Sequence, residues 1–157
     1  MHIPSYTNGF TIIEVLVVLA LAVGIGGLAL MVSFDTYRAS SLRVDQGALI
    51  SVLQHARALS LHAVCLGSTC TEGASHGVAI QSDTYVIFEG PSYALRNVEN
   101  DVDVEAYPHI VHSGLSEIVF ASSSARVVMG GDIILTDEIG HSSTISIGSE
   151  GQIVWNH

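Results

Sequence analysis

The chain has 157 residues, of which 48% are hydrophobic and only 13% are charged. Fifteen acidic side chains against five arginines, with no lysine, give a formal net charge of −10. Because nucleic-acid binding depends on lysine and arginine displacing counterions from phosphates, this balance argues against DNA or RNA as a partner. The length allows one modest folded domain once an apolar segment near the start is set aside.

This apolar segment runs from Phe10 to Phe34 and is long enough to cross a bilayer as a helix. No charged residue occurs between Val15 and Val32. No lysine or arginine precedes the segment and no A-x-A site follows it, so a cleaved secretory signal peptide is the weaker interpretation. The sequence predicts a single membrane pass, residues 10–34, that carries one carboxylate, Glu14, near its beginning.

The segment opens on the motif Gly9-Phe10-Thr11-Ile12-Ile13-Glu14, followed by Val-Leu-Val-Val-Leu-Ala. This motif resembles the class III signal of type IV pilins and type II secretion pseudopilins. The resemblance implies that residues 1–9 are a leader, that a prepilin peptidase cuts between Gly9 and Phe10, and that Phe10 is then methylated on its amine. The leader MHIPSYTNG departs from the family pattern, because it contains no lysine or arginine and only His2 could carry a positive side chain.

The same resemblance implies a role for Glu14. A lone carboxylate in the membrane costs about 2.5 kcal/mol or more. In the family, this carboxylate meets the new amine of a neighbouring subunit during filament assembly, and a paired charge is far less costly than a stranded one. The alternative is a carboxylate that is merely tolerated near the membrane interface by snorkelling or protonation.

After the membrane segment the pattern becomes amphipathic. Apolar residues recur at spacings of three, four and seven: Leu42, Leu49, Ile50, Leu53, Ala56 and Leu59. Polar residues lie between them: Arg43, Asp45, Gln46, Gln54 and Arg57. The pattern predicts that the same helix continues through residues 35–63 and ends near His62 and Ala63. A long N-terminal helix, half in the membrane and half packed on a head domain, is the plan of type IV pilins.

Two cysteines, Cys65 and Cys70, follow the predicted helix. On the oxidising side of a bacterial inner membrane, a pair this close predicts a disulfide that closes a short loop, worth about 2 kcal/mol. A metal site needs more thiols or histidines than this pair offers.

Residues 64–157 are rich in short runs typical of strands, separated by Gly, Ser, Asp and Asn: HGVAIQ, TYVIFEG, SEIVFAS, ARVVMGG, DIILTD, STISIGS and GQIVWNH. The expected fold class is therefore α+β, a long N-terminal helix packed on an antiparallel β-sandwich-like head. Residues 117–155 resemble the C-terminal half of the domain shared by H-type pseudopilins and FimT-type minor pilins. The implied final strand begins at Gly151-Gln152-Ile153-Val154.

Other clusters offer weaker signals for binding or catalysis. The segment ENDVDVE reads either as an oxygen-rich calcium loop or as an edge strand with a solvated face, and its acidic residues are Glu99, Asp101, Asp103 and Glu105. His109 and His112 lie in YPHIVHSG, which reads as extended chain, so surface or hydrogen-bonded histidines are favoured over metal ligands. No nucleophile elbow or spaced triad is evident, so we expect neither an enzyme nor a cofactor.

Two classes of function follow. The first is a structural subunit of a pilus-like filament at the bacterial inner membrane, with its head in the periplasm. Its partners would be the prepilin peptidase, other pilins or pseudopilins of the filament and its tip, and the inner-membrane assembly platform. The second is a membrane-tethered binding module. Within the first class the acidic composition favours a minor pseudopilin of the type II secretion system, whereas the cysteine pair favours a FimT-type minor pilin of a type IV pilus.

Overall fold

A computed structural model describes residues 11–67 and 73–156, without the side chains of residues 29–39. The chain divides into two compact units, residues 1–37 and residues 38–157. The elements in chain order are α1 (Ile12–Leu61), β1 (His76–Ile80), β2 (Thr84–Glu89), the short 3-10 helices η1 (Tyr93–Leu95) and η2 (Val98–Asn100), β3 (Val102–Glu105), β4 (Val111–Gly114), β5 (Glu117–Phe120), β6 (Gly131–Thr136), β7 (Ser142–Ile147) and β8 (Ile153–Asn156).

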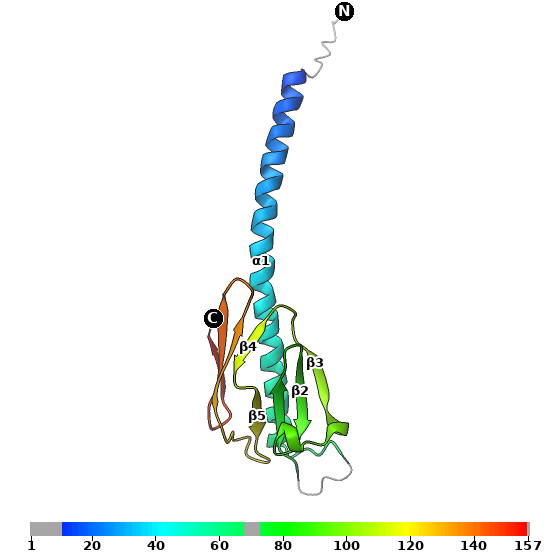
Figure 1. The fold of residues 1–157 in the computed structure, drawn as a ribbon, viewed down its shortest axis with the longest axis vertical. Coiled ribbons are helices and arrows are strands. Elements are labelled where there is room, and N and C mark those ends of the chain that lie inside the picture. The colour runs from blue at the N-terminus through cyan, green and yellow to red at the C-terminus, as the bar shows by residue number, and fades with distance from the viewer. Residues whose placement is uncertain (1–10, 68–72, 157) are drawn as a thin grey trace, which may run out of the picture. The chain divides into compact units, whose positions relative to one another are not determined.

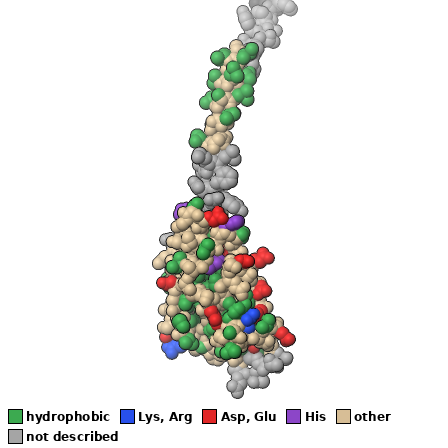
Figure 2. Space-filling view, viewed as in Figure 1, with side chains coloured by type: hydrophobic (Ala, Val, Ile, Leu, Met, Phe, Trp, Pro, Cys, Tyr) green, Lys and Arg blue, Asp and Glu red, His purple; other side chains and the backbone are tan. Residues whose placement is uncertain are grey.

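In the first unit, α1 carries only exposed side chains from its start to Leu28. Apolar side chains cover the visible face of this segment (Figure 2). The predicted membrane pass, residues 10–34, lies partly outside the described residues, because Phe10 and the side chains at 29–34 are not described. Within what is described, no helix combines the length and the apolar character needed to span a membrane.

In the second unit, the remainder of α1 supplies one side of the hydrophobic core. Its buried apolar residues are Leu42, Leu49, Val52, Leu53 and Ala56. They share one core with inward-facing residues of both sheets, among them Ile87 of β2 and Ile145 of β7. At about 25 cal/mol per Å² of apolar surface, such burial is the main force that holds helix and sheets together. The α+β fold class predicted from the sequence is confirmed.

The strands form two antiparallel four-stranded sheets (Figure 1). The first has the order β3-β2-β1-β5, and the second has the order β4-β6-β7-β8. The register pairs Val78 with Ile87 and Ile118 in the first sheet, and Ile145 with Ile133 and Trp155 in the second. A smaller cluster on the outer face of the first sheet consists of Ala79, Val86 and Phe88 and is covered by Tyr93 of η1.

Most of the predicted strands are present, and the helix ends at Leu61, one residue before the predicted His62. The predicted strand over ARVVMGG is wrong. Only Val127 forms an isolated bridge, to Phe120, before β6 begins at Gly131. The backbone has positive φ at Ser123 and Ala125, so the chain turns here between the two sheets instead of extending along one of them.

Two short strands were not among the predicted runs. β3 contains Asp103 and Glu105 and lies at one edge of the first sheet, which agrees with the edge-strand reading of ENDVDVE. β4 contains His112 and lies at one edge of the second sheet. Acidic side chains are spread over the visible face of this second unit (Figure 2), in keeping with the net charge of −10.

Candidate functional site

The first residues of α1 hold the only carboxylate in the exposed apolar half of the helix, over its described side chains. Thr11 precedes the helix, and its Oγ1 accepts a hydrogen bond from the backbone N–H of Glu14 at 3.4 Å. Thr-x-x-Glu at this position has the pattern of a capping box, in which the fourth residue favours the helix start. An acidic group in the first turn also interacts well with the helix dipole. Glu14 therefore has a possible local role besides the one implied by the signal motif.

Gly9 and Phe10, the predicted cleavage and methylation residues, lie outside the described residues. The relation between the Glu14 carboxylate and an amine on Phe10 thus stays a prediction. Further along the same half of the helix, a Cβ added to Gly24, Gly26 or Gly27 would meet nothing within 4 Å. These glycines are consequently not required by close packing within the described part of the chain.

A buried polar network joins α1 to both sheets. The hydroxyl of Tyr85 on β2 donates to Asp45 Oδ2 of α1 at 2.7 Å. Nε2 of His112 on β4 lies 2.9 Å from the same Oδ2 and 2.6 Å from the Tyr85 hydroxyl. The backbone N–H of Tyr107 donates to Asp45 Oδ1 at 2.8 Å. One carboxylate of α1 thus contacts β2, β4 and the segment just before β4.

The network is closed to solvent. Asp45 and Tyr85 are 0% exposed, and the His112 side chain is 6% exposed. Burial, together with the neighbouring Asp45 carboxylate, raises the pKa of Tyr85, so its hydroxyl remains a donor. A buried carboxylate is tolerated only when its lone pairs are satisfied, and here the Tyr85 hydroxyl and the Tyr107 N–H donate to it and the His112 ring lies within hydrogen-bond distance. We interpret this network as structural, because its side chains are buried and their polar atoms contact one another.

The sequence interpretation missed this network. It placed Asp45 and Gln46 among the polar residues of an amphipathic helix, yet both are buried. They stand three and four residues after Leu42, at positions of the buried face. A polar residue at such a position is the signal that could have located the network.

A second buried pair lies near the end of α1. His76 on β1 is 0% exposed, and its Nε2 is 4.0 Å from Glu89 Oε2 on β2. Burial lowers the pKa of His76, and the nearby Glu89 carboxylate opposes that effect. Glu89 Oε2 accepts the backbone N–H of Leu66 at 2.7 Å, and the backbone N–H of His76 donates to Ser60 Oγ at 2.8 Å. These bonds fix the helix end and the following segment to the first sheet.

One cysteine of the predicted disulfide, Cys65, lies in the segment that follows α1. Cys65 is not a free thiol in the structure. Cys70 lies outside the described residues. The pairing of the two cysteines therefore stays a prediction.

The acidic residues proposed for calcium are not brought together. Glu99 lies in η2 and Asp101 follows it, and Asp101 Oδ2 accepts from Arg96 Nε at 2.7 Å. Asp103 and Glu105 are exposed on β3. Over residues 11–67 and 73–156, no three acidic, histidine or cysteine side chains gather in a way that could hold a metal ion. The edge-strand interpretation fits the structure better.

The two histidines of YPHIVHSG are separated in space and in role. His109 is exposed, with its Nδ1 2.9 Å from Glu138 Oε1. His112 is buried in the network around Asp45. As the sequence indicated, one is a surface histidine and the other is hydrogen bonded.

Comparison with known proteins found no relative of this chain. No protein-family model matches the chain, and neither the curated proteins nor the solved structures searched contain a match. The function must therefore be argued from the motif at the helix start and from the geometry of the chain itself.

Proposed function

We propose that the chain is a pilin-like structural subunit, a minor pseudopilin of the type II secretion system that helps to initiate or cap the periplasmic pseudopilus. In this proposal, prepilin peptidase removes residues 1–9. The apolar half of α1 resides in the inner membrane before assembly, and the second unit lies in the periplasm. The chain is then taken into the filament by the assembly platform.

The observation that carries the proposal is the contrast between the two halves of α1. Every described side chain from Thr11 to Leu28 is exposed and almost all are apolar, whereas the face from Leu42 to Ser60 is buried in the chain's own core. A contiguous exposed apolar surface of this kind marks a contact with lipid or with other proteins. Helices of neighbouring subunits, or the bilayer before assembly, are the surfaces that would cover it.

Glu14 is the assembly residue in this proposal. Its carboxylate would pair with the methylated amine of Phe10 in a neighbouring subunit, which offsets the cost of a charge among apolar helices. The local contact to Thr11 does not require a charge at residue 14, whereas the intersubunit pair does. Glutamine can replace glutamate in a capping box, but it cannot replace the charge.

A FimT-type minor pilin of a type IV pilus is the second candidate. The observation that favours it is the placement of Cys65 and Cys70 directly after the helix, just before β1. The net charge of −10 opposes the DNA-binding role of some proteins of that type. We retain the type II secretion assignment as the primary proposal.

The test is complementation of a deletion strain, with secreted exoproteins and surface pili scored side by side. The complementing genes encode wild type, Glu14→Gln, Glu14→Leu and, as the matched control, Thr11→Val, which removes the capping oxygen and keeps the carboxylate. We expect both Glu14 variants to fail and Thr11→Val to function. Loss of secretion alone supports the pseudopilin, and loss of pili alone supports the FimT-type pilin.

Two other outcomes would contradict the proposal. If Glu14→Gln restores both secretion and pili, the charge has no role in assembly. If Thr11→Val fails as completely as Glu14→Gln, the helix start matters and the intersubunit pair does not explain the defect. Levels of each variant in the membrane fraction must equal wild type, so that assembly and stability are not confused.

A further inference from the structure

Strand β5 lies at one edge of the first sheet, because it pairs with β1 on one side only. The backbone N–H of Ile80 donates to the carbonyl of Ser116 at 2.8 Å. In an antiparallel ladder the backbone groups of alternate residues point to the same side. Those of Glu117 and Val119 therefore point away from β1. Val119 faces Val128 across the antiparallel Phe120–Val127 bridge, which leaves the backbone of Glu117 at the open edge.

The segment after β5 begins to cover this edge and then leaves it. Phe120 bridges to Val127, and the Ala121 N–H donates to the Arg126 carbonyl at 2.8 Å. Beyond Val127 the chain diverges toward β6. A gap remains between the first residues of β5 and the diverging segment.

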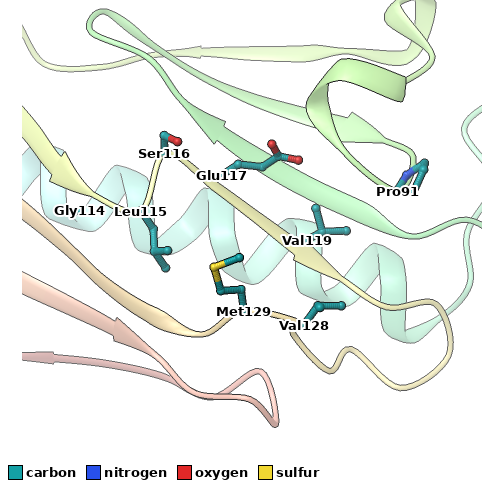
Figure 3. Close-up of a pocket in the computed structure, with 8 residues that line it drawn as sticks. All are labelled: Pro91, Gly114, Leu115, Ser116, Glu117, Val119, Val128 and Met129. Atoms are coloured by element: carbon teal, nitrogen blue, oxygen red, sulfur yellow. The ribbon is translucent and has the colours of Figure 1, made fainter.

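This gap is a cavity of about 440 Å³. Figure 3 shows its lining: Val128 and Met129 lie on one side of β5, Pro91 lies across β5 from them, and the β4–β5 connection lies at the start of the strand. The lining is apolar at Leu115, Val119, Val128 and Met129. We call this cavity the β5 slot.

Two properties of the β5 slot indicate that something binds there. Val128 is 94% exposed and Met129 is 71% exposed, so two adjacent apolar side chains stand in solvent at its rim. The carboxylate of Glu117 lines the slot, and the lining contains no lysine or arginine. Oε1 of Glu117 accepts the backbone N–H of Tyr93 at 2.6 Å, and this hydrogen bond holds the carboxylate in place.

The opposite edge of the same sheet is different. On β3 the exposed side chains include Asp103 and Glu105. Charged residues on an edge strand oppose pairing with another chain. β5 has a single carboxylate, and it lies beside an apolar cavity.

We propose that the β5 slot binds an extended segment of a different protein subunit, one that alternates apolar and basic residues. The segment would pair with the backbone of Glu117 as an added strand, place an apolar side chain among Val119, Val128 and Met129, and set a lysine or arginine beside the Glu117 carboxylate. A second copy of this chain is a poor occupant, since it contains no lysine and carries a net charge of −10. The inference does not depend on Glu14 or on filament assembly.

The test uses the full chain in detergent micelles and two labelled peptides, acetylated and amidated. The first, Lys-Val-Lys-Val-Lys, can form a strand. The second, Lys-Pro-Lys-Pro-Lys, has the same charge, but its prolines cannot donate hydrogen bonds and it pairs poorly as a strand. Fluorescence anisotropy measures binding, and amide hydrogen exchange reports where the peptide lies.

We expect the valine peptide to bind more tightly than the proline peptide and to slow amide exchange at Glu117. Glu117→Gln should weaken binding about fivefold, as expected for the loss of one partly exposed ion pair. The local structure should not change, because the amide oxygen of glutamine can still accept the backbone N–H of Tyr93. The matched control Glu105→Gln, on the β3 edge, should bind like wild type. Glu14→Gln should also leave binding unchanged, which separates this inference from the proposed function.

Three results would overturn the inference. Equal binding of both peptides would mean that only the overall negative charge attracts them. Protection at β3 or elsewhere, with none at β5, would place the binding on another surface. Absence of binding would also overturn it, because the proposed recognition uses backbone pairing and residue alternation and needs no particular sequence.

Discussion

Oδ2 of Asp45, in the middle of α1, lies 2.9 Å from Nε2 of His112 on β4, although the two residues are 67 positions apart in the chain. Tyr85 on β2 completes the contact by donating to the same oxygen at 2.7 Å. Since β2 and β4 belong to different sheets, this carboxylate joins the helix to both of them. The position of the helix against the head therefore depends on a polar contact as well as on the apolar core.

Removal of the Asp45 carboxylate should be strongly destabilising. Asp45→Ala removes the shared acceptor and leaves the Tyr107 N–H without its partner, while the buried Tyr85–His112 pair keeps only the contact between its own two side chains, so we expect a loss of about 3 kcal/mol or more. Tyr85→Phe removes one donor and should cost about 1 to 2 kcal/mol. Urea unfolding of the full chain in detergent, followed by circular dichroism, measures both changes.

Glu105→Gln is the control for that experiment, because this exposed carboxylate on β3 should change stability by less than about 0.5 kcal/mol. If Asp45→Ala loses no more than Glu105→Gln does, the network does not hold the helix to the sheets.

His76 should make stability depend on pH. Burial lowers its pKa in the folded chain, whereas in the unfolded chain the group titrates near its ordinary value of 6.5. As the pH falls below about 6.5, the unfolded state gains a proton that the folded state does not, and the free energy of unfolding decreases by up to about 1.4 kcal/mol per pH unit. The loss continues until the pH reaches the lowered folded pKa.

The comparison of wild type with His76→Gln isolates this contribution from those of the other histidines. Unfolding free energies at pH 7 and pH 5 should differ more for wild type than for the variant. An equal difference in the two chains would show that His76 does not titrate differently on folding.

Two glycines with positive φ should respond differently to alanine. Gly151 has a φ of 76°, and an added Cβ would clash with the carbonyl oxygen of Ala125. Gly140 has a φ of 89°, but an added Cβ would meet nothing within 4 Å. We expect Gly140→Ala to cost about 1 kcal/mol from backbone strain alone, and Gly151→Ala to cost clearly more. Equal thermal shifts for the two variants would mean that the contact at Ala125 relaxes without cost.

The predicted disulfide can be tested by alkylation. Intact chain purified without a reducing agent should resist a thiol reagent until it is reduced, and should then take up the reagent at Cys65 and Cys70. Cys65→Ser should lower stability by about 2 kcal/mol relative to the oxidised wild type, and by little relative to the reduced one. Ready labelling of the unreduced chain would show that the loop is open.

The sequence was sufficient for the helix and for most of the strands, because their apolar residues follow the helical or the alternating period. It failed over ARVVMGG, where β-branched residues suggested a strand. There the chain crosses from β5 to β6, and Val128 and Met129 are exposed. The need to connect the two sheets therefore decides the conformation of this segment, and the strand propensity of its residues does not.

The polar core could be predicted less well. Asp45 stands among the polar residues of the amphipathic pattern, and charged residues are seldom fully buried. Its three partners come from β2, β4 and the segment before β4, and no local pattern indicates that these segments meet at one carboxylate. The β5 slot depends in the same way on where two segments diverge, and residue spacing does not encode that.

The most direct test of the central claim is the N-terminus of the mature chain, determined by mass spectrometry of protein purified from the cells that naturally produce it. A pilin-like subunit should begin at Phe10, with one methyl group on its amine, and Gly9→Val should leave the leader attached. A chain that retains Met1, or that is cut at another position, would contradict the proposal that it is processed and assembled as a pilin-like subunit.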